Sequence, residues 1–184
     1  MLMKALEIFL LMLEAAGGKM AGKTLVQKRA YFLSEMLKLG LHFKPHYYGP
    51  YSPELDDAIG KAKVLDFVQE SAVTLGPDLR TGFEVRRYDY SLTRDGKVVV
   101  QALRERYRYD WERLAATLAK IREADRDNYL ALSLAAKVFY ILSSTGKRLT
   151  ASDIVTEAAR VGWRVSAGEI ERATDLLVSL GLVA

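Results

Sequence analysis

Residues 52–96, SPELDDAIGKAKVLDFVQESAVTLGPDLRTGFEVRRYDYSLTRDG, decide the fold of this chain. Ser52 is typical of a helix N-cap, and Pro53 suits the first helical position that follows it. Three acidic residues favour the positive end of the helix dipole: Glu54, Asp56 and Asp57. The sequence therefore predicts a helix that begins here and ends near Ala62.

Two strand-like runs follow this helix, at residues 67–75 and 83–92. A turn-rich segment with two glycines separates them, so the two runs should form a β-hairpin. Upstream, the spacing of apolar residues predicts one helix from about Leu2 to Ala16 and a second helix that starts near Thr24. Three helices followed by a hairpin is the order of a winged helix-turn-helix domain, which we assign to residues 1–96.

The second half of the chain is predicted to be helical. One long helix should run from Arg94 to about Ala124, and we expect residues 97–125 to connect the two halves and to form a homodimer interface. Residues 126–184 repeat a helix-turn-helix rhythm, in which Ser166 and Glu169 have the spacing of a capping box. This part is either a plain helical domain or a second winged helix that lacks most of its wing. The predicted fold class is mainly α with a small β-ribbon.

Composition excludes several classes of protein. Cysteine is absent from the 184 residues, which excludes a disulfide framework, cysteine nucleophiles and thiolate metal sites and fits a reducing cytoplasm. No apolar stretch free of charge reaches the ~18 residues that a membrane span requires, so we expect a cytoplasmic protein without membrane contact. The formal net charge of +4 is compatible with a polyanionic partner but does not require one.

Three motifs carry a family resemblance. They are GKTLVQK at residues 22–28, FKPHYYGPYSPEL at residues 43–55 and YDYSLTRDG at residues 88–96. With them the chain resembles the YwgA-like group of prokaryotic winged-helix proteins, and it is more distantly similar to the SocA/Panacea antitoxin domain. The resemblance implies a winged helix and implies no catalytic residues. Arg29 departs from the family pattern, which usually has an aliphatic residue after Gln-Lys.

The residues of catalytic or metal sites do not assemble into a recognisable pattern. His42 and His46 are the two histidines, and without a nearby carboxylate they make a poor metal site. The sequence contains neither a phosphate-binding P-loop nor a nucleophile elbow. We therefore expect no enzyme activity, no cofactor and no metal.

The first functional hypothesis is a DNA-binding transcriptional regulator. Eight basic residues of the predicted helices and hairpin are candidates to contact the phosphates of double-stranded DNA: Lys23, Lys28, Arg29, Lys61, Lys63, Arg80, Arg86 and Arg87. The acidic start of the third helix argues against ordinary reading of the major groove, because that end of a recognition helix usually meets the DNA.

The alternative hypothesis is a protein-interaction module, antitoxin-like or an adaptor. It would hold a protein partner with the acidic third helix and the tyrosines of the Gly-Pro loop, Tyr47, Tyr48 and Tyr51. These rings either pack the loop against the helices or form a surface on which bases stack. A second aromatic group is a candidate interface for the homodimer: Tyr107, Tyr109 and Trp111.

Overall fold

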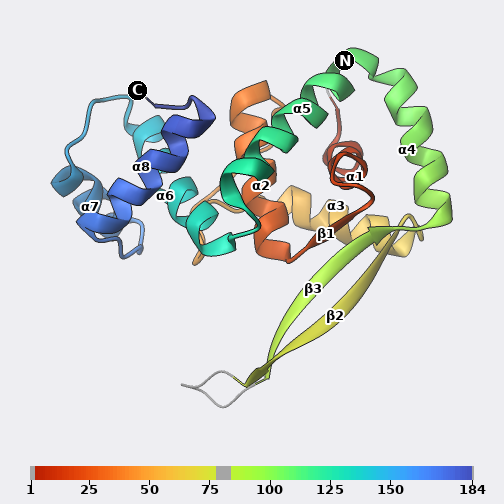
Figure 1. Ribbon diagram of the computed structural model, residues 1–184, viewed down its shortest axis with the longest axis horizontal. Helices are drawn as coiled ribbons and strands as arrows, with labels where there is room; N and C mark the ends of the chain where they lie inside the picture. The colour runs from red at the N-terminus through yellow and green to blue at the C-terminus, as the bar shows by residue number, and fades with distance from the viewer. Residues whose placement is uncertain (1–2, 78–83, 184) are drawn as a thin grey trace.

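The computed structural model describes residues 3–77 and 84–183 and is mainly helical, with one small antiparallel sheet (Figure 1). Its elements, in chain order, are α1 (Ala5–Ala15), β1 (Lys19–Ala21), α2 (Lys23–Leu37), α3 (Pro53–Val64), β2 (Val68–Pro77), β3 (Glu84–Leu92), α4 (Arg94–Arg106), α5 (Arg108–Asp125), α6 (Tyr129–Thr145), α7 (Ala151–Arg160) and α8 (Ala167–Leu180). The predicted fold class, mainly α with a small β-ribbon, is confirmed. None of the helices in the described part of the chain is long and apolar enough to cross a membrane.

The sheet joins the predicted hairpin to a short strand that the sequence analysis did not predict. Its strand order is β1-β3-β2, and β1 pairs antiparallel with β3 through Met20 opposite Tyr90. The first half of the described chain thus runs α1, β1, α2, α3, β2 and β3, and its assignment as a winged helix-turn-helix domain stays a prediction. The ten residues of β2 span about 33 Å at ~3.3 Å per residue. Figure 1 shows the hairpin projecting well beyond the helices as a wing.

The start of α3 forms as its sequence predicts. The Ser52 hydroxyl accepts a hydrogen bond from the Leu55 backbone N–H at 3.3 Å, and Pro53 occupies the first turn. The segment before it, residues 38–52, is far longer than the 3–4-residue turn of a compact helix-turn-helix. This segment is therefore a long loop and not the short turn of a compact helix-turn-helix. It is attached to α2.

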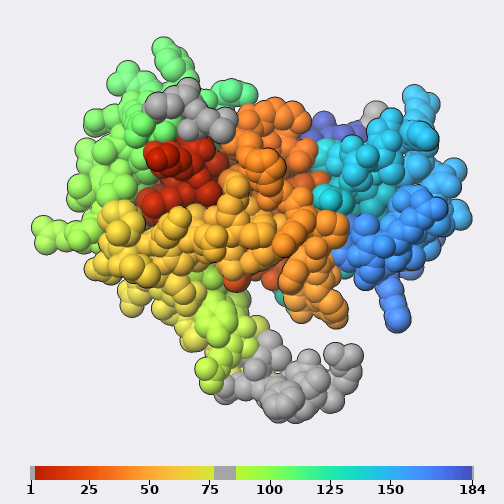
Figure 2. Space-filling model, turned by 180° about the vertical axis from the view of Figure 1, so that it is seen from behind, coloured from red at the N-terminus to blue at the C-terminus, as the bar shows by residue number. Residues whose placement is uncertain are grey.

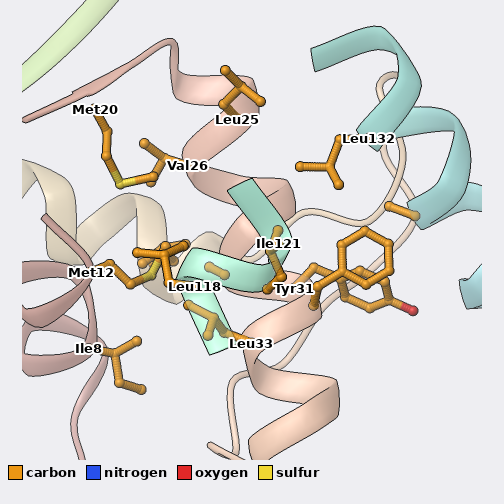
Figure 3. Close-up of a cluster of buried hydrophobic side chains, with 14 of the residues drawn as sticks. Ile8, Met12, Met20, Leu25, Val26, Tyr31, Leu33, Leu118, Ile121 and Leu132 are labelled. Carbon is orange, nitrogen blue, oxygen red and sulfur yellow. The ribbon is translucent and has the colours of Figure 1, made fainter. Parts of the chain in front are cut away.

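The core is built around α1. All six residues from Ile8 to Leu13 are buried, because α3 packs on one side of the helix and α4 and α5 pack on others. Figure 3 shows Met12 of α1 beside Val26 of α2 and Leu118 of α5. The same hydrophobic cluster continues through α6 to Leu180 of α8, so the described helices share one continuous core.

The single helix predicted from Arg94 to Ala124 is wrong, because the helix breaks at Tyr107. This residue has φ −114° and ψ 36°, and the chain changes direction between α4 and α5 (Figure 1). The Tyr107 ring is buried, and its hydroxyl donates to Glu7 Oε2 at 2.9 Å. The break lets both helices pack against α1, which a straight helix of this length would not allow.

Candidate functional site

A groove of about 870 Å³ separates the hairpin from the helices. One wall is β3 with the end of β1, and the other is the start of α2 with the connection between α5 and α6. Figure 2 shows from behind how the hairpin stands away from the body of the molecule. The groove exists because the hairpin is long and because β1 covers the edge of β3 only as far as Ala21, opposite Asp89.

Positive charge is concentrated in this groove. Six cationic side chains line it: Lys19, Lys23, Arg29, Arg86, Arg87 and Arg122. Two carboxylates, those of Asp89 and Asp127, lie among the described lining residues. Two of the six cations are paired with carboxylates just outside this lining, Lys23 with Asp56 and Arg29 with Asp125. When these two carboxylates are counted as well, six cations against four carboxylates leave the groove with a net charge of +2.

Three of these cations are held in place by carboxylates, and Arg87 and Lys23 are the two of them that remain partly exposed. Arg87 makes a bidentate pair with Asp89, with Nε–Oδ1 at 2.8 Å and a second bond at 2.9 Å, and this hydrogen bonding raises the pKa of the guanidinium. Lys23 Nζ lies 2.5 Å from Asp56 Oδ1, and Tyr51 donates its hydroxyl to Asp56 Oδ2 at 2.6 Å. Burial alone would raise the pKa of Asp56, but these two hydrogen bonds outweigh it and lower the pKa. The fixed positions restrict where an anion can bind.

Three exposed tyrosines share the groove with the cations. Tyr48 comes from the segment between α2 and α3, Tyr88 from β3 and Tyr129 from the first turn of α6. Their exposed fractions are 45%, 41% and 45%, so each side chain keeps much of its surface accessible to solvent. On β3, Arg86 and Tyr88 lie on the same face of the strand because side chains alternate. On this face of β3, a tyrosine ring thus lies next to an arginine.

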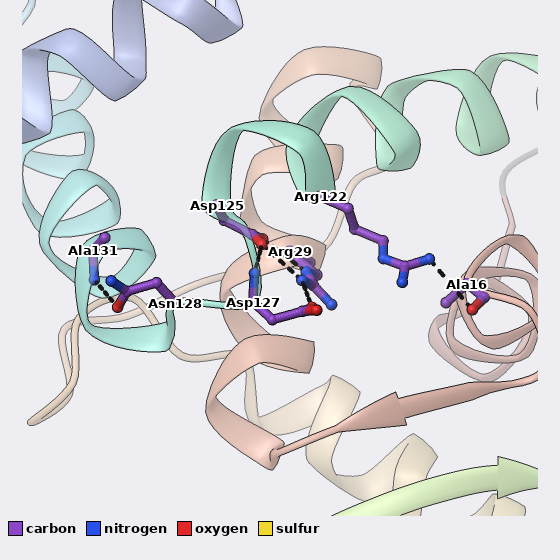
Figure 4. Close-up of polar contacts among 7 residues, drawn as sticks. All are labelled: Ala16, Arg29, Arg122, Asp125, Asp127, Asn128 and Ala131. Atoms are coloured by element: carbon purple, nitrogen blue, oxygen red, sulfur yellow. Dashed lines mark hydrogen bonds and ion pairs between the residues drawn. The ribbon is translucent and has the colours of Figure 1, made fainter.

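Arg29 lies at the floor of the groove but cannot contact a phosphate. Its side chain is 2% exposed and is held by Asp125 through two hydrogen bonds of 2.8 Å and by Asp127 through one of 2.6 Å (Figure 4). The predicted role of Arg29 in binding DNA is therefore wrong. Instead it fixes α2 to the turn between α5 and α6. Asp127 adopts a left-handed backbone with φ 59°, and its N–H donates to Asp125 Oδ1 at 2.7 Å.

Lys28 is likewise buried, which contradicts its predicted contact with phosphate. Its Nζ donates to the Pro50 carbonyl at 2.6 Å, and burial together with the charge of Lys137 lowers its pKa to about 7. The neighbouring Gln27 donates to the Ser52 carbonyl at 3.1 Å and accepts from the Ser52 N–H at 2.9 Å. The Gln-Lys pair of the first motif therefore clamps the Tyr-Gly-Pro-Tyr-Ser loop onto α2.

The remaining predicted cations do not join the groove. Lys61 and Lys63 are exposed on the last turn of α3, and Lys63 pairs with Glu70 on β2 at 2.9 Å. Arg80 lies outside the residues that the structure describes. Of the eight basic residues predicted from the sequence, the described groove presents Lys23, Arg86 and Arg87 to solvent, and it buries Arg29 in its floor.

The predicted interaction tyrosines have different environments. Tyr47 is 73% exposed and packs edge-on against Tyr48, with ring centroids 4.8 Å apart, whereas Tyr51 is half-buried against Asp56. Tyr47 and Tyr48 also border a second groove of about 800 Å³, which lies between this loop and helices α6 and α8. Tyr48 thus forms part of the lining of both grooves.

The aromatic group predicted for the homodimer is only partly at the surface. Tyr107 is buried against Glu7, so its predicted role in an interface is wrong. Tyr109 is 84% exposed, and Trp111 is half-buried with the Arg104 guanidinium 4.8 Å from its ring. The homodimer itself stays a prediction.

Among the cations and exposed tyrosines that line the groove, sequence reasoning missed four. They are Lys19, Tyr88, Arg122 and Tyr129. Tyr88 could have been found from its alternation with Arg86 on a predicted strand, but Lys19 and Arg122 are single cations about a hundred positions apart. Comparison with protein-family models and with curated proteins gives no match for this chain. The functional argument therefore rests on the geometry of the groove.

Proposed function

We propose that this protein binds nucleic acid in the groove between the hairpin and the helices, in the role of a DNA-binding regulator. The observation that carries the proposal is the placement of cations: Lys19 of β1, Arg86 of β3 and Arg122 of α5 all line the groove. Cationic side chains bind phosphates independently of base sequence, and they supply most of the affinity of non-specific binding. The winged-helix arrangement agrees with this role by analogy of fold.

The charge of α3 favours the groove over this helix as the contact surface. In helix-turn-helix proteins the first residues of the recognition helix meet the edges of bases in the major groove. Here that end of α3 exposes Glu54 and Asp57, whose carboxylates would face the phosphates. Neither residue is among the described residues that line the groove. Asp56 of the same turn borders the groove but is paired with Lys23, so its charge is compensated there.

The test is fluorescence anisotropy with a labelled oligonucleotide, offered as a duplex and as a single strand, over a range of salt concentrations. Each phosphate contact should contribute about 0.9 for a duplex, or about 0.7 for a single strand, to the slope of log affinity against log salt. Lys19→Ala and Arg86→Ala should each weaken binding and reduce the slope by about that amount. The matched controls, Lys147→Ala and Arg148→Ala, remove exposed cations beyond α6. They should leave the affinity and the salt slope unchanged. Failure to bind either form, or equal effects of groove and control variants, would refute the proposal.

A second candidate function is a protein-interaction module, favoured by the exposure of Tyr47 beside the second groove. Leu130, 59% exposed at the start of α6, lies in the same lining and adds apolar surface to it. A protein partner that docks there should bind to the wild-type chain and should not bind to the Tyr47→Asp variant. Tyr109→Asp is the matched control, since Tyr109 is exposed on α5 and lies outside this lining. Equal retention by both variants would exclude this surface.

A further inference from the structure

We infer that the groove takes a single strand of nucleic acid, whose bases stack on Tyr48, Tyr88 and Tyr129, and not a duplex. This inference rests on the proposed function and names the form of nucleic acid that the groove selects. It follows from three features of the described residues: the volume of the groove, the tyrosine rings that line it, and the placement of charge around it.

The shape favours a strand that lies inside the groove. A volume of about 870 Å³ falls in the range of ~300–1,000 Å³ typical of sites that enclose small ligands. The hairpin forms one wall and the helices form the other, so a bound molecule must fit between them. A few nucleotides of one strand can do so. A duplex has two paired backbones and is a wider body than one strand, so we expect less of it to enter a groove of this volume.

The tyrosines supply surfaces that suit unpaired bases. Proteins that bind single strands combine a positive groove with aromatic rings on which successive bases stack, and this stacking tolerates any base. Tyr48, Tyr88 and Tyr129 come from three separate elements of the chain, and all three rings line the groove. Tyr48 is supported edge-on by the Tyr47 ring at an interplanar angle of 84°. A base in a duplex is already stacked and paired, so these rings would gain nothing from it.

The cations are placed to follow the backbone of such a strand. Arg86 lies two residues before Tyr88 on the same face of β3, whereas Lys19 of β1 pairs with Ser91 and so lies on the other face of the sheet, with Arg87. On the opposite wall Arg122 donates one N–H to the Ala16 carbonyl at 3.3 Å, and a guanidinium has several more donors to offer. Phosphates can therefore be contacted from both walls while the bases face the rings.

The acidic start of α3 discriminates against a duplex. A duplex that lies across the wing and α3, as in major-groove recognition, brings its phosphates toward Glu54 and Asp57. These two carboxylates are not part of the described lining of the groove, and Asp56, the acidic residue of the same turn that borders the groove, is paired with Lys23. The same chain is thus repulsive to the wider ligand and attractive to the narrower one.

The experiment compares labelled oligo-dT of about 15 nucleotides with a duplex of equal length at constant low salt, by fluorescence anisotropy; sites of this kind cover ~4–16 nucleotides. We expect the single strand to bind more tightly. Tyr88→Ala and Tyr129→Ala should each weaken its binding about 5- to 150-fold, as expected for the loss of one stacked base. Tyr88→Phe and Tyr129→Phe keep the rings and should bind as the wild type does. Tyr109→Ala, which removes an exposed ring outside the groove, is the matched control and should have no effect.

Each other outcome decides against the inference. Duplex binding as tight as single-strand binding, or tighter, would overturn it and leave the proposed function intact. Preference for the single strand with no loss in the alanine variants would also overturn it, because the rings would then not hold the bases. Absence of binding to both probes would overturn the proposed function as well. Circular dichroism melts of all variants separate loss of binding from loss of fold.

Discussion

Replacing Arg29 with methionine is expected to destabilise the protein severely. The guanidinium makes two hydrogen bonds of 2.8 Å to Asp125, and the side chains of both residues are almost completely buried. Removing one partner of a buried ion pair leaves the other charge without compensation, at a cost of about 3–5 kcal/mol. Asp127 also loses its 2.6 Å bond to Arg29, but it is largely exposed, so its share should be small.

The assay is urea denaturation followed by far-UV circular dichroism at neutral pH, with a thermal melt beside it. A loss of 3–5 kcal/mol corresponds to a decrease in Tm of roughly 6–20 °C for a chain of this length. The double variant Arg29→Met/Asp125→Leu removes both charges and should recover much of the loss, because a buried pair is often replaceable by apolar groups. Recovery should be incomplete, since Asp125 Oδ1 also accepts from the Asp127 N–H.

A matched control is Arg160→Met, which removes the exposed Arg160–Glu157 pair of α7. Such surface pairs contribute about 0–1 kcal/mol, so this variant should unfold close to the wild type. If Arg29→Met lowered the free energy of unfolding by less than about 1 kcal/mol, or if the double variant were no better than the single one, the buried pair would not hold α2 to the α5–α6 turn as argued.

Three further predictions concern close packing and pH. Gly96→Ala should destabilise the fold by at least about 1–3 kcal/mol, because an ideal Cβ at Gly96 would lie 2.0 Å from the Phe67 carbonyl oxygen; an unchanged urea midpoint would contradict this close approach. Burial lowers the pKa of Lys28 in the folded protein to about 7, below its value in the unfolded chain. The folded protein therefore binds fewer protons than the unfolded chain between these two pKa values. The free energy of unfolding should increase from pH 7 to pH 9 by up to about 1.4 kcal/mol per pH unit. Lys28→Met should flatten that increase, and an equal slope in the variant would refute it. The hydrogen bond from Arg29 lowers the pKa of Asp127 in the folded protein. The ionised Asp127 carboxylate therefore stabilises the fold above its unfolded pKa of about 3.9, and this stabilisation is lost as pH falls through the folded pKa. Asp127→Asn should therefore be less stable than wild type at pH 7, and its stability should decrease less on acidification. Urea midpoints at pH 7 and at a pH below the unfolded pKa would measure both effects.

Local features of the fold could be predicted because their partners are close in sequence. Ser52 caps α3 three residues before its donor, and the reciprocal capping box of Ser166 and Glu169 at α8 forms as predicted. The hairpin follows from two alternating strands on either side of a turn-rich segment. β1 was missed because a strand of three residues carries too little alternation to recognise, and it is stabilised by pairing with β3, about seventy positions away.

Long-range contacts could not be predicted in the same way. A cation on an amphipathic helix has the same sequence pattern whether it faces solvent or a carboxylate from another helix. Arg29 and Asp125 are 96 positions apart, and no spacing rule connects them. The break at Tyr107 has the same origin. No glycine or proline marks it, and it forms because packing of α4 and α5 around α1 outweighs the continuity of the helix.

The residues wrongly predicted to touch phosphate instead build the surface that we propose for nucleic acid. On α2, Gln27 and Lys28 bind the backbone of the loop that carries Tyr48, and Arg29 binds the turn that leads into Tyr129. One short stretch of helix thus positions two of the three rings, from segments that are eighty positions apart. Substitutions in this stretch should therefore impair binding through the arrangement of the tyrosines and leave the salt dependence of the remaining affinity unchanged, whereas loss of Lys19 should reduce that dependence directly. Measured salt slopes would separate these two kinds of effect, and a reduced slope in Lys28→Met would show that its amine contacts phosphate after all.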